Sequence, residues 1–463
     1  MKLLKIHMRY HPPGIILEYS QKGVVKSKEI DLLDLNCDTN IPSLAARLYA
    51  KEVLLTEDVK DQLEQCLTTL KKRVEHEGPA GKRFYIYKTL MTHVLPLTNV
   101  AFDKTGQRCL SGSYDRTCKV WDVESGKELK TLAGHQNVVY SVAFNFPSCN
   151  RVITGSFDKS ARIWDPETGE CLATLWGHGG EVVAAQFSAK GDLAATGSMD
   201  HTAKLFDVKT GEEIHTYSGH TAEVIALQFD PNEGQRLITG SFDGTISMWD
   251  TRMRDRVSVL CGHEGEISNV QFNWDSSLVG SSSLDGSAKL WDARQSSCLA
   301  TVSGHTDEVL DICFDWAGQR MATASSDCSA RVYDVRTDFT ELAVMKGHRE
   351  EVSKVCFSPA GGSLLTASAD RTARIWNTST GNCTQVLSGH QGEIFSCAYS
   401  YAGDAIITAS KDNTCRIWRW GVMKYNIVAG SEGLMPGELC VDSSDTDRDK
   451  LANAVCAERV DAC

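Results

Sequence analysis

The chain lacks the features that attract nucleic acid or a membrane. Its 463 residues carry 48 Lys and Arg against 60 Asp and Glu, a net charge of -12, so no basic field is available for a polyphosphate backbone. No stretch reaches the roughly 18 apolar residues of a membrane span. Lys5, His7 and Arg9 interrupt the first apolar run, which is unlike a secretory signal. We therefore expect a soluble intracellular chain with no nucleic acid and no membrane among its partners.

The cysteines and short motifs indicate no catalytic or metal chemistry. The 17 cysteines are scattered, without the close pairs of a zinc site or a redox motif. Reduced thiols in the cytoplasm are the simplest interpretation. The chain also has no Walker-type loop and no His-Glu-x-x-His zinc motif. We expect no catalytic residue, no metal and no cofactor.

One pattern occurs eight times. A Ser or Thr is followed four residues later by an Asp and ten residues later by an aromatic residue, and a His stands 22 or 23 residues before each Asp. The aspartates are Asp115, Asp158, Asp200, Asp243, Asp285, Asp327, Asp370 and Asp412. The histidines are His93, His135, His178, His220, His263, His305, His348 and His390. The period of 42 or 43 residues is typical of propeller blades, and the apolar runs between turns predict four strands in each repeat.

The last repeat has only three expected strands because it ends near Trp420. Residues 88–93 align with residues 130–135 at an offset of 42 residues, so residues 84–90 are predicted to form the outer strand of the eighth blade. A strand from the N-terminal side would close the ring and leave no free edge.

Pairs of residues at the ends of these repeats resemble the signature of the WD-repeat family over residues 84–420. Examples are Gly134-His135 with Trp164-Asp165, and Gly262-His263 with Trp291-Asp292. The resemblance implies an all-β fold, an eight-bladed WD-repeat β-propeller. The departures are Thr92 before the first His, Phe206 and Tyr333 in place of Trp, and Asn377 and Arg419 in place of the final Asp.

A Ser or Thr, a His and an Asp are also the parts of a hydrolase triad. Eight equivalent copies favour a structural role. In that interpretation Trp164 donates its indole N–H to Thr154, Thr154 bonds His135, and Asp158 holds the His, so that the buried polar groups satisfy one another. The equivalent residues of the fifth repeat are His263, Ser281, Asp285 and Trp291.

The flanks lack the repeat. Residues 1–83 predict a small α+β N-terminal domain with a linker: strands near residues 3–8, 15–19 and 24–30, then two helices capped by Ser43 and Thr56. The second helix carries an apolar stripe, which is either the core of this domain or a groove for a partner helix. The stripe is Val59, Leu63, Cys66, Leu67, Leu70 and Val74. Residues 421–463 are expected to be an acidic, disordered tail.

Four segments narrow the resemblance. They are residues 9–19 (RYHPPGIILEY), 30–35 (IDLLDL), 95–100 (LPLTNV) and 411–418 (KDNTCRIW). They are similar to the axonemal dynein assembly factors with WD repeats. That resemblance implies a non-enzymatic cargo adaptor of the cytoplasm and of the cilium or flagellum, including the basal body region. Its implied partners are outer-arm dynein and a subunit of the intraflagellar transport complex, and we expect the chain to be a monomer.

The residue before each Asp is predicted to point into the face that carries the His and Asp loops. In blades one to five it is apolar: Tyr114, Phe157, Met199, Phe242 and Leu284. In blades six to eight it is Ser326, Ala369 and Lys411. An exposed apolar arc is typical of an interface. The alternative is that these side chains pack between the blades.

Six repeats carry a Glu three residues after the His. They are Glu181, Glu223, Glu266, Glu308, Glu351 and Glu393. We expect these carboxylates near the mouth of the channel, where they would attract a basic partner segment within the limits of mutual repulsion and salt screening.

The second function considered is a WD-repeat substrate receptor or scaffold subunit of another cytoplasmic complex, such as a ubiquitin ligase. A G-protein-like β subunit belongs to the same class, but the N-terminal segment lacks the long heptads of its coiled coil. Scaffolds of this shape serve many functions, so the repeat alone does not decide between the two.

Overall fold

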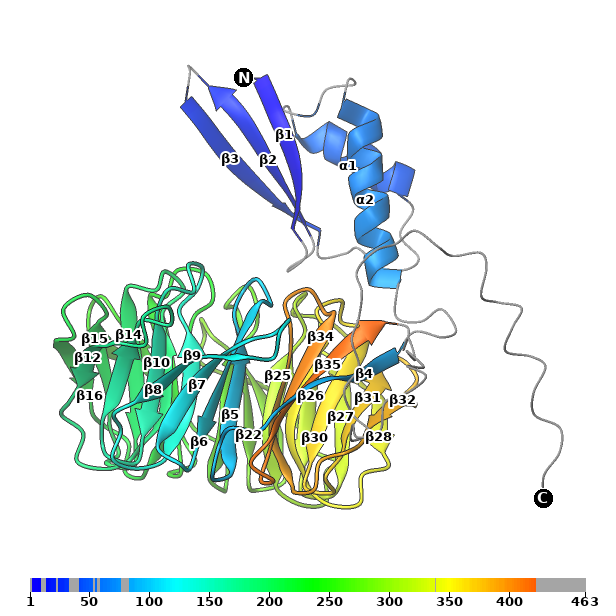
Figure 1. Ribbon diagram of the computed structural model, residues 1–463. Helices are drawn as coiled ribbons and strands as arrows, with labels where there is room; N and C mark the ends of the chain where they lie inside the picture. The colour runs from blue at the N-terminus through cyan, green and yellow to red at the C-terminus, as the bar shows by residue number, and fades with distance from the viewer. Residues whose placement is uncertain are drawn as a thin grey trace, which may run out of the picture. The chain divides into compact units, whose positions relative to one another are not determined.

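The computed structural model describes residues 2–9, 14–21, 24–32, 41–52, 55, 59–75, 83–337 and 339–421. From residue 83 onward the described chain forms eight sheets of four strands each, which Figure 1 shows side by side. A three-stranded sheet and two helices precede them. The expected eight-bladed β-propeller is confirmed. Among the described helices, none has both the length and the apolar character needed to cross a bilayer.

The blades are numbered one to eight along the chain, each from its inner to its outer strand. Blades one and two are β5 (Leu97–Phe102), β6 (Arg108–Ser113), β7 (Thr117–Asp122), β8 (Glu128–Ala133), and β9 (Val139–Phe144), β10 (Val152–Ser156), β11 (Ala161–Trp164), β12 (Cys171–Leu175). Blades three and four are β13 (Val182–Phe187), β14 (Leu193–Ser198), β15 (Ala203–Asp207), β16 (Glu213–Tyr217), and β17 (Val224–Phe229), β18 (Arg236–Ser241), β19 (Ile246–Asp250), β20 (Asp255–Leu260). Blades five and six are β21 (Ile267–Phe272), β22 (Leu278–Ser283), β23 (Ala288–Asp292), β24 (Cys298–Val302), and β25 (Val309–Phe314), β26 (Arg320–Ser325), β27 (Ser329–Asp334), β28 (Glu341–Lys346). Blades seven and eight are β29 (Val352–Phe357), β30 (Ser363–Ser368), β31 (Ala373–Asn377), β32 (Cys383–Leu387), and β33 (Ile394–Tyr399), β34 (Ala405–Ser410), β35 (Cys415–Gly421), β4 (Arg83–Leu90).

The burial of each strand explains the pattern of apolar and polar residues in the repeat. In blade three the inner strand β13 is buried at alternate positions near its end, β14 is almost entirely buried, and the outer strand β16 is mostly accessible. The second strand of each blade reads as a nearly continuous run of small and apolar residues because neighbouring blades cover it on both sides. The inner strands of successive blades contact one another around the whole ring, including β33 with β5.

The ring closes through β4, which lies where residues 84–90 were expected. It pairs antiparallel with β35, from Leu90 opposite Cys415 to Arg83 opposite Gly421. Phe84 is buried, and its ring lies 5.1 Å from that of Trp420. The side chain of Gln385 in blade seven makes two hydrogen bonds with the backbone of Phe84. The Phe84 amide donates to Gln385 Oε1 at 2.9 Å, and Gln385 Nε2 donates to the Phe84 carbonyl. The outer strand of blade eight is therefore held by its own blade and by the preceding one.

Aromatic rings also join blades that are not neighbours. Four of them follow inner strands, at the end of the blades away from the His and Asp loops: Phe146 of blade two, Trp274 of blade five, Trp316 of blade six and Tyr401 of blade eight. Ring centroids are 5.4 Å apart for Phe146 and Tyr401, 5.7 Å for Tyr401 and Trp316, and 5.6 Å for Trp316 and Trp274. Contacts at these distances are favourable. The Phe146–Tyr401 contact ties blade two to blade eight across blade one, and the Trp316–Tyr401 contact ties blade six to blade eight across blade seven.

A polar chain joins the inner strands of blades five, six and seven. Asn269 donates to Asp311 Oδ1 at 2.6 Å, and the Lys354 ammonium lies 3.4 Å from the same oxygen. The Val355 amide donates to Asp311 Oδ2 at 2.9 Å. The buried carboxylate therefore has three donors, one of them charged, as a buried charge requires.

The N-terminal residues have a hydrophobic core of their own. The sheet is β1 (Lys2–Arg9), β2 (Gly14–Gln21) and β3 (Val24–Asp31), and the helices are α1 (Ile41–Lys51) and α2 (Lys60–Glu75). Leu63, Leu67 and Leu70 of α2 are buried in one cluster with Ile15 and Leu17 of β2. The apolar stripe is thus the core of this unit, and the alternative of a groove for a partner helix is wrong.

Two details of the N-terminal prediction need comment. α1 begins at Ile41, so Ser43 is its third residue and not its cap. Pro42 fits in the first turn, where a missing N–H needs no partner. Thr56, the linker residues 76–82 and the tail beyond Gly421 lie outside the described residues.

The closing strand generates a test by truncation. A chain that begins at Arg83 keeps β4, and we expect it to remain folded and monomeric. A chain that begins at Thr92 leaves the β35 edge unpaired and loses the burial of Phe84 and Leu90, about 1.5–3 kcal/mol each. We expect a lower thermal midpoint and self-association, measured by differential scanning fluorimetry and light scattering. Equal midpoints and two monomers would refute the closing role.

Candidate functional site

The His, Asp, hydroxyl and aromatic residues of each repeat meet at one end of the blade. In blade two, His135 Nδ1 lies 2.8 Å from Asp158 Oδ2, and Nε2 lies 2.7 Å from Thr154 Oγ1. The Trp164 indole donates to the same hydroxyl at 2.8 Å. These are the hydrogen bonds expected from the sequence.

The same network recurs around the ring. In blade five the His263–Asp285, His263–Ser281 and Trp291–Ser281 distances are 2.8, 2.8 and 2.9 Å. The other six blades have both His contacts as well. Phe206 and Tyr333 take the place of Trp in blades three and six, so no indole reaches the hydroxyl there.

A further hydroxyl, which the sequence analysis missed, completes each network. Asp285 Oδ1 accepts hydrogen bonds from Ser287 Oγ at 2.6 Å and from the Ser287 amide at 2.8 Å. Oδ2 accepts one from the Glu264 amide at 3.0 Å. The equivalent hydroxyls of the other blades are Thr117, Ser160, Thr202, Thr245, Ser329, Thr372 and Thr414. A Ser or Thr two residues after every Asp was the available signal.

These contacts set the protonation states. Burial alone would raise the pKa of Asp285, but hydrogen bonds from Ser287, His263 and the Glu264 amide outweigh it and lower the pKa to about 2. Burial lowers the pKa of His263 despite the opposing effect of Asp285. The same two directions hold for His178 with Asp200, His220 with Asp243, His305 with Asp327 and His390 with Asp412. At neutral pH a neutral imidazole therefore faces an ionised carboxylate.

One proton arrangement satisfies every group in blade five. The Trp291 indole donates to Ser281, the Ser281 hydroxyl donates to His263 Nε2, and His263 Nδ1–H donates to Asp285. This is also the connectivity of a hydrolytic triad. Here, however, the hydroxyl is fully buried, as it is in all eight blades, and it already accepts the indole hydrogen. The network is out of reach of a substrate, and its geometry supports the structural interpretation.

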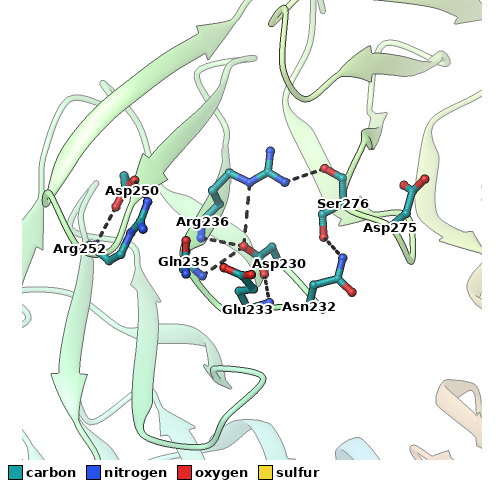
Figure 2. A pocket seen from close by; sticks show the side chains of 9 residues that line it. All are labelled: Asp230, Asn232, Glu233, Gln235, Arg236, Asp250, Arg252, Asp275 and Ser276. Carbon is teal, nitrogen blue, oxygen red and sulfur yellow. Dashed lines mark hydrogen bonds and ion pairs between the residues drawn. The ribbon is translucent and has the colours of Figure 1, made fainter. Parts of the chain in front are cut away.

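A pocket lies between blades four and five, at the end of the blades opposite the His–Asp networks (Figure 2). It is lined by turn residues, several of whose polar groups hydrogen-bond to one another. It has a volume of about 320 Å³. Asp230 accepts hydrogen bonds from the Glu233 and Gly234 amides at 2.8 and 2.7 Å, and Arg236 donates to the Ser276 carbonyl at 2.8 Å. Nowhere in the described chain do three or more His, Cys, Asp or Glu side chains gather as metal ligands. The hydrogen bond from Arg236 to Ser276 joins blade four to blade five, so these residues hold adjacent blades together.

The apolar arc lies at the same end of the blades as the His–Asp networks. Tyr114 and Met199 are exposed, at 40% and 37%, while Phe157, Phe242 and Leu284 are half-buried. Each arc residue is one residue before an Asp whose hydrogen bonds fix the turn. All five arc side chains are thus at least partly accessible, which is compatible with an interface and with partial packing between blades.

In blades three to five the backbone places the arc residue beside a predicted glutamate. The Met199, Phe242 and Leu284 amides donate at 2.9 Å to the carbonyls of Glu181, Glu223 and Glu266. Ser326 is joined to Glu308 and Ala369 to Glu351 in the same way. In blades one and two the acceptors are Pro96 and Val138. The face therefore changes from apolar in blades one and two, to mixed apolar and acidic in blades three to five, to acidic in blades six and seven.

The six glutamates are not equivalent. Lys411 Nζ lies 2.9 Å from Glu393 Oε1, so that carboxylate is neutralised within its own blade. Among the described residues, no salt bridge joins Glu181, Glu223, Glu266, Glu308 or Glu351 to a basic side chain. Five of the six carboxylates therefore lack a salt bridge within the described residues, and one is paired.

Tyr140 extends the apolar part of this face and was missed from the sequence. It belongs to β9, is 44% exposed, and stacks on Phe157 with ring centroids 5.4 Å apart and planes at 22°. It lies on an inner strand, outside the turns that carry Asp, and so it is not part of the repeated pattern. Tyr114, Tyr140 and Phe157 give this sector its aromatic character.

Most of the propeller sequence matches models of known protein families. A family model described as the first β-propeller of IFT122 matches residues 96–353. A model described as the WD domain, G-beta repeat, matches residues 339–377 and 381–419. Among solved structures, the computationally designed Ika8 protein aligns with a TM-score of 0.64 and 29% identity, over 71% of this chain and 97% of that one.

Curated relatives share a shorter stretch at higher identity. The dynein assembly factor with WD repeat domains 1 of Danio rerio is 52% identical over 152 residues, 33% of this chain and 36% of that protein. The protein of that name from Homo sapiens is 50% identical over 152 residues, 33% and 36% of the two chains. The chain thus matches about a third of the length of these relatives.

The network generates a stability test. His263→Ala removes the buried acceptor of the Ser281 hydroxyl and one of the donors to Asp285, and it should lower the free energy of unfolding by about 1–3 kcal/mol, measured by chemical denaturation. The matched control is His201→Ala in an exposed turn, where no buried group of the described chain loses a partner, and we expect a smaller change there than for His263→Ala. Equal effects, or weaker partner binding with unchanged stability, would contradict the structural role.

Acid should destabilise the ring. The histidine pKa values are lowered in the folded state, so the unfolded chain, with His pKa values of about 6.5, takes up protons first. The stabilisation is complete above about pH 6.5 and is lost as the pH falls toward the folded values. The aspartates act in the same direction from about pH 4 toward pH 2. The thermal midpoint should therefore fall between about pH 7 and pH 5; an unchanged or higher midpoint would be inconsistent with these shifts.

Proposed function

The chain belongs to the WD-repeat β-propeller family described as the first β-propeller of IFT122, and from that premise we propose that it is a non-enzymatic cargo adaptor. In this proposal it links preassembled outer-arm axonemal dynein to the intraflagellar transport complex and is needed for dynein assembly in motile cilia. It would act in the cytoplasm and in the cilium or flagellum.

The observation that carries the dynein part is the identity to proteins named dynein assembly factor with WD repeat domains 1. It is 49–52% over 147–152 residues in six vertebrate species. Identity at this level supports a shared role in dynein assembly. Because the match spans about a third of each relative, the full set of partners belongs to the proposal.

The geometry supports binding in preference to catalysis. The hydroxyls that resemble nucleophiles are buried in all eight blades, and their hydrogen bonds are used within the blade. What the propeller offers to other molecules is a closed, edge-free scaffold with an apolar and acidic face. Such a scaffold can hold a partner without changing it chemically.

An adaptor needs one surface for each partner. The chain has two candidates, the propeller and the N-terminal unit with its separate core. We propose that the transport complex binds the N-terminal unit and the propeller together, and that dynein binds the propeller. The name of the matching propeller family and the resemblance of residues 9–19 and 30–35 support a link to ciliary transport.

The test is affinity capture of the tagged full chain from ciliated cells, with the bound proteins identified by mass spectrometry. We expect outer-arm dynein and intraflagellar transport subunits. Recovery of cullin-complex subunits in their place would favour the substrate-receptor function and overturn the adaptor proposal.

The chain that begins at Arg83 tests the division of labour. It lacks the N-terminal unit but keeps the closing strand, so we expect it to fold, to retain dynein subunits and to lose most of the transport subunits. Its thermal midpoint, measured alongside, shows that the propeller is intact. Capture of transport subunits at full strength would place that site on the propeller alone.

A further inference from the structure

Blades four and five carry an uncompensated acidic and apolar surface, which we call the blade four–five surface. It consists of Glu223, Phe242, Glu266 and Leu284. Backbone hydrogen bonds of 2.9 Å join Phe242 to Glu223 and Leu284 to Glu266, so each apolar residue is placed beside an acidic one. The two pairs belong to adjacent blades, at the same end of both.

The residue after the Asp shows how this sector differs from others. In blades one, two and seven it is basic, namely Arg116, Lys159 and Arg371. In blades four and five it is Gly244 and Gly286, with φ of 74° and 79°. The turn needs a positive φ, and glycine adopts it without a side chain. No basic group from these turns stands near the carboxylates.

Blade eight provides the contrast within the same molecule. There the position equivalent to Phe242 is Lys411, and its ammonium lies 2.9 Å from Glu393. The charge of that glutamate is satisfied inside the chain. Glu223 and Glu266 have no such partner among the described residues, so their charge is available to another molecule.

We infer that the blade four–five surface binds a lysine- or arginine-rich segment of a partner protein that also carries aliphatic or aromatic side chains. Basic groups of the segment meet Glu223 and Glu266, and its apolar side chains cover Phe242 and Leu284. This rests on the proposed function, since it names the kind of segment that the adaptor would hold. Charge complementarity identifies the occupant: an acidic segment would face unpaired carboxylates, and a purely apolar one would bury them at a cost.

The experiment uses the purified full chain and labelled peptides, with binding followed by fluorescence anisotropy. The probe is a peptide of alternating lysine and leucine; alternating glutamate and leucine, and alternating lysine and serine, are the comparison peptides. We expect the first to bind most tightly, the lysine–serine peptide more weakly, and the acidic peptide not at all. Tight binding of the acidic peptide would overturn the inference.

Charge variants locate the site. Glu223→Gln combined with Glu266→Gln should weaken binding of the lysine–leucine peptide about three- to tenfold at about 0.1 M salt and less than about twofold at 1 M, where screening is nearly complete. Glu393→Gln should have little effect because Lys411 already neutralises that residue. Glu167→Gln with Glu170→Gln removes the same charge from the exposed turn between β11 and β12, at the opposite end of a blade. An equal loss in this last variant would show that only net charge matters and would refute the site.

The apolar half has its own variant. Phe242→Ala should weaken binding on the order of 30-fold at both salt concentrations, as expected for a desolvated anchor. Its thermal midpoint is measured in parallel; if it unfolds, the charge variants alone decide. Concentration-dependent dimers that Phe242→Ala abolishes would identify a second copy as the occupant and overturn the inference. Because purified peptides are used, this result is independent of whether dynein and transport subunits are captured from cells.

Discussion

The pairing of β4 with β35 is the contact on which the rest of the propeller depends. It joins residues 83–90 to residues 415–421, so the blade that ends the repeat array is completed by the strand that begins it. Every inner strand then has a neighbour on both sides. The aromatic contacts from blade two to blade eight and the Asn269, Asp311 and Lys354 chain hold parts of the same circle together. A closed ring leaves its turns in fixed places, and a binding surface can be built on them.

The networks of His, Asp and hydroxyl groups show how the same chemistry serves structure when it is buried. Their connectivity is that of a triad, but a nucleophile must be reachable and must have a free lone pair for attack. The Ser281 hydroxyl is not reachable, because it is fully buried, and one of its two lone pairs already accepts the Trp291 indole hydrogen. Reactive groups inside the blade thus stabilise its turns, and function is left to side chains outside these networks.

The sequence predicted the eight blades, the closing strand and the hydrogen-bonded groups because each follows from the period of the repeat. A His and an Asp 22 or 23 residues apart meet whenever the strands between them pair in register. Tyr140 and Asp311 were missed because their contacts are not encoded in the repeat spacing. Tyr140 stacks on Phe157 through the shape of one blade, and Asp311 receives donors from both neighbouring blades. The helix start at Ile41 was missed because Pro42 and Ser43 are both good residues for a first turn.

Within the arc, the backbone and the side chain have separate tasks. The Phe242 amide bonds the Glu223 carbonyl, and the Lys411 amide bonds the Glu393 carbonyl in the same geometry. The turn therefore forms with either side chain. Side chains at this position can differ from blade to blade while the fold stays the same. Phe242 beside a glutamate without a salt bridge in the described chain and Lys411 beside a paired one therefore differ in the charge and polarity that the turn presents at this face.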